Sequence, residues 1–197
     1  VVNLSEMRLY LFPAGNGPPM TFPVGIGREG WLTPTGEFEV VQKQVNPTWY
    51  PPASIRREDP DLPAAVPPGP DNPLGTHALR LSSRSILIHG TDRPFGVGRK
   101  ASHGCLRLYP EDIPVLYERV PVGTRVVIVR EPVKVGVRGG RVLVEVHADE
   151  DSTIEALAEA RRILKRRKLS DRVDPDRLEA AVRERSGVPV DVTSDRI

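Results

Sequence analysis

Proline is concentrated in one segment of this chain, and that segment limits what the chain can fold into. Nine of the 27 residues from 47 to 73 are proline. Proline has a fixed φ and no amide hydrogen, so it does not fit a helix interior or a central strand. We therefore expect residues 47–73 to form neither, and to lie as an ordered loop over a domain, because strand-like patterning resumes directly afterwards.

The overall composition is that of a globular chain. It has 197 residues, of which 39% are hydrophobic and 27% charged, which excludes a largely disordered chain. No run of about 18 apolar residues occurs, so the sequence predicts no membrane-spanning helix. The formal net charge of +2 is too small to indicate nucleic-acid binding.

Short strand-like runs fill most of residues 1–148. Apolar segments bounded by glycine or proline turns predict strands over 7–12, 22–27, 36–42, 77–81, 85–88, 125–129, 133–137 and 141–146. The last two should form a hairpin around Arg138-Gly139-Gly140. One short helix is expected over 110–120. The pattern predicts a mainly β domain with some α structure over residues 1–148.

The composition changes near Asp149, where helical periodicity begins. Residues 153–169 and 176–185 predict two helices, with Ser152 as the candidate N-cap of the first. We assign residues 149–197 to a helical C-terminal appendage.

A basic run lies in the first of these helices. Residues 161–168 hold six basic residues in eight, a pattern that can bind anionic glycan, lipid or nucleic acid. Acidic residues such as Glu155 and Glu159 lie about one helical turn away. We therefore favour a solvated helix face on which these charges are paired.

Cys105 is the only cysteine of the chain and lies close in sequence to His89 and His103. A single cysteine excludes an internal disulfide and any site that needs several cysteines. The segment between the two histidines is rich in glycine and polar residues, which predicts a loop. An adjacent imidazole can convert a thiol to a thiolate–imidazolium pair, so either histidine is a candidate base for a cysteine nucleophile.

The neighbours of the cysteine suit a nucleophile. Gly104 permits unusual backbone angles and close approach of a substrate. The amides of Gly104 and Cys105 are candidate donors of an oxyanion hole. Arg107 can hold a substrate carboxylate or brace the loop.

Two other interpretations stay open from the residues alone. The thiol can be a small buried hydrophobe. His89, His103 and Cys105 also match the ligand types of a zinc site with an open position. The remaining histidines, His77 and His147, lie in strand-like runs and are expected to be structural or solvent-facing.

The two motifs that carry a resemblance are His89-Gly90-Thr91 and Ser102-His103-Gly104-Cys105-Leu106-Arg107-Leu108. Together they resemble the signature of the L,D-transpeptidase (YkuD) family, especially its ErfK/YbiS/YcfS/YnhG branch. The likeness extends over residues 1 to about 147, through segments 2–10, 23–27, 47–49, 62–64, 68–73 and 120–126. We place no counterpart of the helical appendage in that branch.

The resemblance implies a fold and a reaction. The fold would be a β sandwich with a short helix beside the catalytic loop. Cys105 would attack a peptidoglycan stem tetrapeptide after its third residue, diaminopimelate, and release D-alanine. His89 would be the proton donor and acceptor, oriented by the backbone carbonyl of Gly90, with His103 in support. The family uses no metal and no cofactor.

The resemblance also implies substrate contacts and partners. Ser102, Thr91, Arg107 and Trp49 would contact the substrate, although ordinary packing is the favoured alternative for Trp49. The acyl acceptor would be an amine of another stem, or a lysine of an envelope lipoprotein or outer-membrane protein. The expected location is the periplasm or cell envelope, after removal of a signal peptide, and no nucleic acid is expected as a partner.

The sequence does not determine which molecule accepts the acyl group, so alternative functions stay open. The same fold can act as a hydrolase, either as an L,D-carboxypeptidase or as an amidase that releases cross-linked protein. A catalytically silent cell-wall-binding scaffold is a further alternative, which the intact set of His89 and Cys105 disfavours.

Overall fold

The computed structural model describes residues 1–15, 17–83 and 85–195, and the chain divides into two compact units between Val129 and Arg130. This division lies earlier than the boundary predicted at residue 148. The reason is the hairpin of β11 (Val133–Arg138) and β12 (Arg141–Val146), which packs with the C-terminal helices rather than with the preceding strands. The second unit is therefore not purely helical.

Eight strands form one sheet in the first unit, in the order β3-β2-β1-β10-β5-β6-β7-β9. All neighbours are antiparallel except the parallel pairs β1–β10 and β7–β9. Their bounds are β1 (Val2–Asn3), β2 (Arg8–Leu11), β3 (Met20–Pro23), β5 (Gly36–Val45), β6 (His77–Leu81), β7 (Leu87–His89), β9 (Leu106–Arg107) and β10 (Arg125–Val129).

One strand predicted from the sequence is split in two. The run over 22–27 contributes its start to β3, while β4 (Ile26–Gly27) pairs in parallel with β8 (Lys100–Ser102) in a separate two-stranded sheet. The mainly β prediction is confirmed, since the unit is mostly sheet with a few helices. A short 3₁₀ turn, η1 (Pro94–Gly96), lies in the loop before β8.

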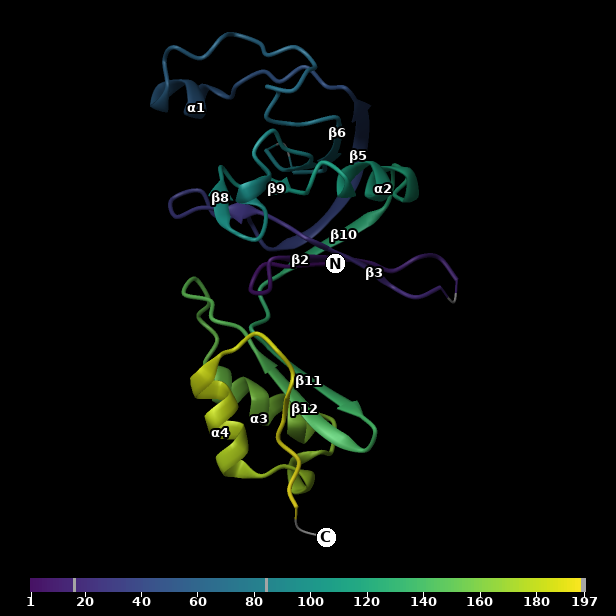
Figure 1. Cartoon of the computed structure of the whole chain (residues 1–197), viewed down its shortest axis with the longest axis vertical. Helices are drawn as coiled ribbons and strands as arrows, with labels where there is room; N and C mark the ends of the chain where they lie inside the picture. The colour runs from purple at the N-terminus through teal and green to yellow at the C-terminus, as the bar shows by residue number, and fades with distance from the viewer. Residues whose placement is uncertain (16, 84, 196–197) are drawn as a thin grey trace. The chain divides into compact units, whose positions relative to one another are not determined.

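A single apolar core holds the first unit together. Helix α2 (Asp112–Arg119) packs against β6 (Figure 1). It contributes the buried side chains Ile113 and Leu116 to the core. Ile88 of β7 and Leu106 of β9 are 3% and 0% exposed. Full burial of one such side chain stabilises a fold by about 1.5–3 kcal/mol, so these two residues hold β7 and the edge strand β9 on the core.

The proline-rich segment contains a helix that the sequence excluded. Helix α1 spans Ala53–Glu58, so the expectation of no helix in residues 47–73 was wrong for these six positions. They contain no proline, and Pro52 stands at the N-cap, where its fixed φ does not interrupt the helix. The rest of the segment is irregular and ordered, as expected.

One buried asparagine holds this segment in place. Asn72 is 1% exposed, and its Nδ2 donates to the carbonyl oxygens of Pro47, Val66 and Pro67 at 2.8, 3.1 and 3.1 Å. Trp49 and Val66 also exchange a pair of backbone hydrogen bonds, at 2.9 and 2.8 Å. Proline lacks an amide hydrogen, so the side-chain amide of Asn72 supplies donors that the prolines of this segment do not.

The second unit is a three-stranded sheet with two helices. The sheet order is β11-β12-β13, with β13 at Val190–Asp191, and the helices are α3 (Ala156–Arg166) and α4 (Pro175–Glu184). A short 3₁₀ turn, η2 (Ser170–Arg172), separates the helices. The predicted hairpin is confirmed, because Gly139 and Gly140 join β11 to β12 with positive φ angles of 54° and 77°.

For helix α3, the predicted N-cap residue was wrong, whereas the predicted pairing of charges on its face is present. The N-cap is Glu155 rather than Ser152, and its carboxylate accepts from the amides of Leu157 and Ala158. The paired helix face is present: Arg162 pairs with Glu159 at 2.6 Å and Arg161 with Glu179 of α4 at 2.9 Å. None of the described helices is long and apolar enough to cross a membrane.

Candidate active site

The strand β7 and its edge neighbour β9 bring the reactive side chains to one face of the sheet. Ile88 and Leu106 are register partners and point into the core. Side chains of a strand alternate between faces, so the residues on either side of these two point the other way. Those residues are Leu87, His89, Cys105 and Arg107. Cys105 comes directly before β9, so extending the parallel register by one position places it beside Leu87.

His89 is fixed as a neutral imidazole. It is 4% exposed, and its Nδ1 lies 2.5 Å from the carbonyl oxygen of Gly90. A carbonyl only accepts hydrogen bonds, so Nδ1 carries the proton and Nε2 presents its lone pair. Burial lowers the pKa of His89 to about 4, and the positive charge of Arg107 acts in the same direction. This side chain can therefore accept a proton at neutral pH.

Cys105 is a half-buried thiol in its protonated form. Its Sγ donates to the carbonyl oxygen of Ser85 at 3.5 Å. Burial raises the pKa of the Cys105 thiol, although the charges of Arg107 and Arg80 oppose that shift. The raised pKa of this thiol and the lowered pKa of His89 both disfavour a thiolate–imidazolium pair in the free protein. Transfer of the proton from Cys105 to His89 is then expected to accompany attack on a substrate.

Ser102 braces the loop that carries the cysteine. It is 1% exposed, its Oγ donates to the carbonyl of Cys105 at 2.6 Å, and it accepts from the amide of Gly104 at 3.1 Å. The hydroxyl of Ser102 is thus engaged within the loop, while the residue also lines a cavity beside Cys105. The Gly104 amide is already bonded to Ser102 Oγ, so of the two expected oxyanion-hole donors we favour the Cys105 amide.

A threonine far away in sequence holds the other side of this loop. Thr33 Oγ1 donates to the carbonyl of Gly104 at 3.0 Å and accepts from the amide of Gly27 at 2.9 Å. Gly104 itself has a φ of +102°, a conformation that favours glycine. Thr33 was missed in the sequence, where it stands in an ordinary turn signal, because its partner lies 71 residues away.

His103 belongs to a charged cluster that links the catalytic loop to helix α1. Its Nε2 lies 2.9 Å from Glu58 Oε2 and 3.0 Å from Arg28 Nη2, and Arg28 pairs with Glu58 at 2.7 Å. Its ring also stacks edge-on against Trp31, with 5.0 Å between centroids. The bond from His103 lowers the pKa of Glu58. His103 is therefore anchored to the proline-rich segment.

The zinc interpretation finds no support in this geometry. Within the described residues, Cys105, His89 and His103 do not form a group with the spacing of metal ligands. His103 directs Nε2 to Glu58, and His89 uses Nδ1 for Gly90.

Thr91 is placed differently from its expected role. It is 4% exposed, and its Oγ1 accepts from the amide of Arg93 at 2.9 Å. Of the expected site residues, Thr91 and Gly90 line neither of the two cavities beside the cysteine. Thr91 therefore shapes the loop between β7 and β8 and is not positioned as a substrate contact.

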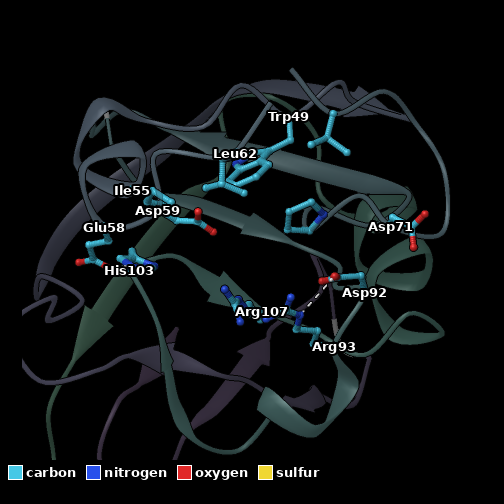
Figure 2. Close-up of a pocket in the computed structure, with 12 residues that line it drawn as sticks. Trp49, Ile55, Glu58, Asp59, Leu62, Asp71, Asp92, Arg93, His103 and Arg107 are labelled. Carbon is cyan, nitrogen blue, oxygen red and sulfur yellow. Dashed lines mark hydrogen bonds and ion pairs between the residues drawn. The ribbon is translucent and has the colours of Figure 1, made fainter. Parts of the chain in front are cut away.

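Two adjoining cavities lie beside the reactive face. The larger, of about 750 Å³, is lined by Cys105, His89 and Leu87 together with Trp49 and Tyr50 of the proline-rich segment. The smaller, of about 330 Å³, is shown in Figure 2, where Arg107 lies opposite Trp49 and Leu62. The residues that line both are Trp49, Ile55, Pro73, His103 and Arg107. Trp49 therefore presents its aromatic ring to both cavities, and its contact with a substrate stays a prediction.

The first unit matches a known family. The profile of the YkuD family, described as the L,D-transpeptidase catalytic domain, matches residues 1–128. This chain belongs to the L,D-transpeptidase family. The family assigned by resemblance from the two motifs is therefore confirmed.

Similar proteins come from enteric bacteria. The chain is 41% identical over 210 residues to a protein of Salmonella typhimurium named probable L,D-transpeptidase ErfK/SrfK, covering 100% of this chain and 67% of that protein. It is 42% identical over 204 residues to the probable L,D-transpeptidase YbiS of Escherichia coli, covering 96% of this chain and 66% of that protein. The chain thus spans about two thirds of the length of these relatives. Their similarity includes the second unit, for which we had expected no counterpart.

Solved structures share the fold of the first unit at low identity. A structure titled the Ldtfm–avibactam carbamoyl enzyme aligns with a TM-score of 0.52 and 21% identity, covering 66% of this chain and 47% of that one. The C442S mutant of Enterococcus faecium L,D-transpeptidase aligns with a TM-score of 0.50 and 19% identity, over 64% and 47% of the two chains.

Proposed function

We propose that this chain is a cysteine L,D-transpeptidase that acts on peptidoglycan stem peptides. The observation that carries the proposal is the placement of a neutral His89, with Nδ1 tied to Gly90, on the same sheet face as the thiol of Cys105. The family membership supplies the substrate class. Trp49, at the wall of both cavities, supports a groove long enough for a peptide.

In the acylation step, Cys105 loses its Sγ–H proton to Nε2 of His89 as the sulfur attacks the carbonyl carbon after the third stem residue, diaminopimelate. The carbonyl oxygen becomes an oxyanion, for which the amide of Cys105 is the favoured donor. When this intermediate collapses, the C–N bond breaks and His89 returns the proton to the departing D-alanine amine. The products are free D-alanine and a thioester on Cys105.

In the second step, an amine takes the acyl group from the thioester. The attacking nitrogen forms the new amide bond and gives a proton to His89, while the C–S bond breaks and Cys105 regains a proton. The acceptor we propose is the side-chain amine of another stem, or a lysine of an envelope lipoprotein or outer-membrane protein. Hydrolysis by water would instead make the protein an L,D-carboxypeptidase or an amidase.

The proposed location follows from the proposed substrate. Peptidoglycan stems lie in the periplasm, so we propose that the chain acts in the cell envelope. The relatives described above are bacterial proteins named as probable L,D-transpeptidases, which supports a location at the cell wall. No metal or cofactor is needed for either step, since the thiol and the imidazole supply the nucleophile and the proton transfers.

Incubation with a disaccharide-tetrapeptide, followed by liquid chromatography and mass spectrometry, tests the proposal. The wild type should release D-alanine and form cross-linked dimers, while Cys105→Ala should do neither. Tripeptide without dimers would favour the hydrolase. If the wild type leaves the tetrapeptide intact although Cys105 is reactive toward iodoacetamide, the proposal is wrong and a wall-binding scaffold is favoured.

A further inference from the structure

Arg107 has a buried donor that the described residues leave without a partner. Its Nε is inaccessible and has no hydrogen-bond partner among them, although the side chain lines both cavities. The carboxylate of Asp92 acts on Arg107 electrostatically, but it also pairs with Arg93 Nε at 3.6 Å. Buried polar groups in proteins are almost always satisfied, and this cationic side chain lines both cavities, where an anionic group of a ligand can pair with its charge.

The strand register determines on which side of the nucleophile this cation lies. Ala78, His89 and Arg107 are register partners across β6, β7 and β9, so their side chains form one row. The next row is formed by Arg80, Leu87 and, by extension of the register, Cys105. Arg107 therefore stands beside the imidazole, and Arg80 stands in the row of the thiol.

In the proposed reaction, the acyl part of the substrate lies beside the Cys105 row, and the leaving group lies beside the His89 row. The acyl carbon bonds to Cys105, and the departing nitrogen takes its proton from His89. The leaving residue therefore extends from the cysteine row toward the histidine row. In a C-terminal amino acid, the carboxylate is attached to the carbon next to that nitrogen, so it arrives within reach of the side chain beside His89.

We infer that Arg107 binds the C-terminal carboxylate of the residue that is released. It would select stems that end one residue after the scissile bond, because a longer or amidated stem offers no charge at that point. The inference rests on the proposed function. In it, the guanidinium of Arg107 pairs with the carboxylate of the leaving group. Arg80, in the other row, faces the acyl part of the substrate instead.

The test compares two donors that differ by one group. One is the disaccharide-tetrapeptide with a free D-alanine carboxylate, and the other carries D-alaninamide at the same place. The wild type should use the carboxylate donor with a kcat/KM about 100-fold higher, the range expected of hydrogen bonds to a charged group. Arg107→Gln should lower kcat/KM about 100-fold more for the carboxylate donor than for the carboxamide donor, because any effect of the lost charge on Cys105 and His89 is common to both donors, and so bring the ratio close to one. Arg107→Lys should restore part of the preference.

Two matched variants separate this role from a general effect of charge. Arg80→Gln and Arg93→Gln each remove one arginine that lines a cavity, and both should keep the wild-type preference. The inference is overturned if the wild type uses both donors equally, if Arg107→Gln keeps the preference, or if Arg80→Gln loses it instead. The ratio of kcat/KM between the two donors is measured on the wild type, so this part of the test does not depend on whether a variant folds. Release of neither leaving group by the wild type would overturn the proposed function, and this inference with it.

Discussion

The hydroxyl of Ser102 and the carbonyl of Cys105 are joined by a 2.6 Å hydrogen bond inside the catalytic loop. The same hydroxyl accepts from the amide of Gly104, so one buried side chain fixes the backbone on both sides of the glycine. The direction of the thiol therefore depends on a residue that contributes no group of its own to the proposed reaction.

Replacement of Ser102 by alanine should loosen this loop. Two backbone groups would lose their partner in a buried place, which costs about 1–3 kcal/mol. We expect a lower midpoint in urea unfolding and a slower acylation of Cys105. Ser82→Ala is the matched control, because Ser82 accepts one backbone bond at an exposed position and should change stability by less than about 0.5 kcal/mol. Equal effects of the two variants would contradict the bracing role.

Neutral, buried His89 should make the fold sensitive to acid. Its pKa of about 4 lies below the ordinary value of 6.5, so between these pH values the unfolded chain binds a proton that the folded chain does not. Stability is then lost as the pH falls from 6.5 to 4, by about 3 kcal/mol from this group. Urea unfolding across that window should show the loss in the wild type and in His147→Gln, and a weaker slope in His89→Gln. An unchanged slope in His89→Gln would contradict the burial of a neutral imidazole.

The thiol of Cys105 should be slow to ionise in the free protein. Burial raises its pKa, so alkylation by iodoacetamide should rise with pH along a curve whose midpoint lies above that of an ordinary cysteine. Arg107→Gln should move the midpoint further upward, because the guanidinium charge lowers the pKa of this thiol. A plateau that begins below pH 7 would instead reveal the thiolate–imidazolium pair.

The two histidines should differ in their effect on turnover. His89→Ala removes the group that moves the proton and should slow D-alanine release by about 100- to 10,000-fold. His103→Ala breaks the cluster with Glu58 and Arg28, whose charges are exposed, so its loss should be milder. Steady-state rates on the tetrapeptide donor compare the two. The reverse ranking would assign the base to His103.

Local sequence signals predicted the elements that local contacts build. The hairpin around Gly139 and Gly140 was predicted because two adjacent glycines supply the left-handed turn that joins neighbouring strands. The motif residues His89, Cys105 and Arg107 were found by their pattern, and the strand register then determined their mutual placement.

Contacts between distant residues could not be predicted in this way. Glu58 meets His103 across 45 positions, and Thr33 meets Gly104 across 71. Neither pair leaves a periodic signal in the chain. The boundary predicted at residue 148 differs from the division after Val129 for a similar reason. The strands β11 and β12 continue the strand-like pattern of the preceding residues, although their core is shared with α3 and α4.

The most direct measurement of the central claim is the intact mass of the protein after brief exposure to the tetrapeptide donor and quenching in acid. The account predicts a wild-type species heavier by the donor minus D-alanine, with the added mass on the peptide that contains Cys105. The adduct should disappear when an amine acceptor is supplied, and it should be absent from Cys105→Ala. Release of D-alanine by Cys105→Ala at the wild-type rate would contradict the account.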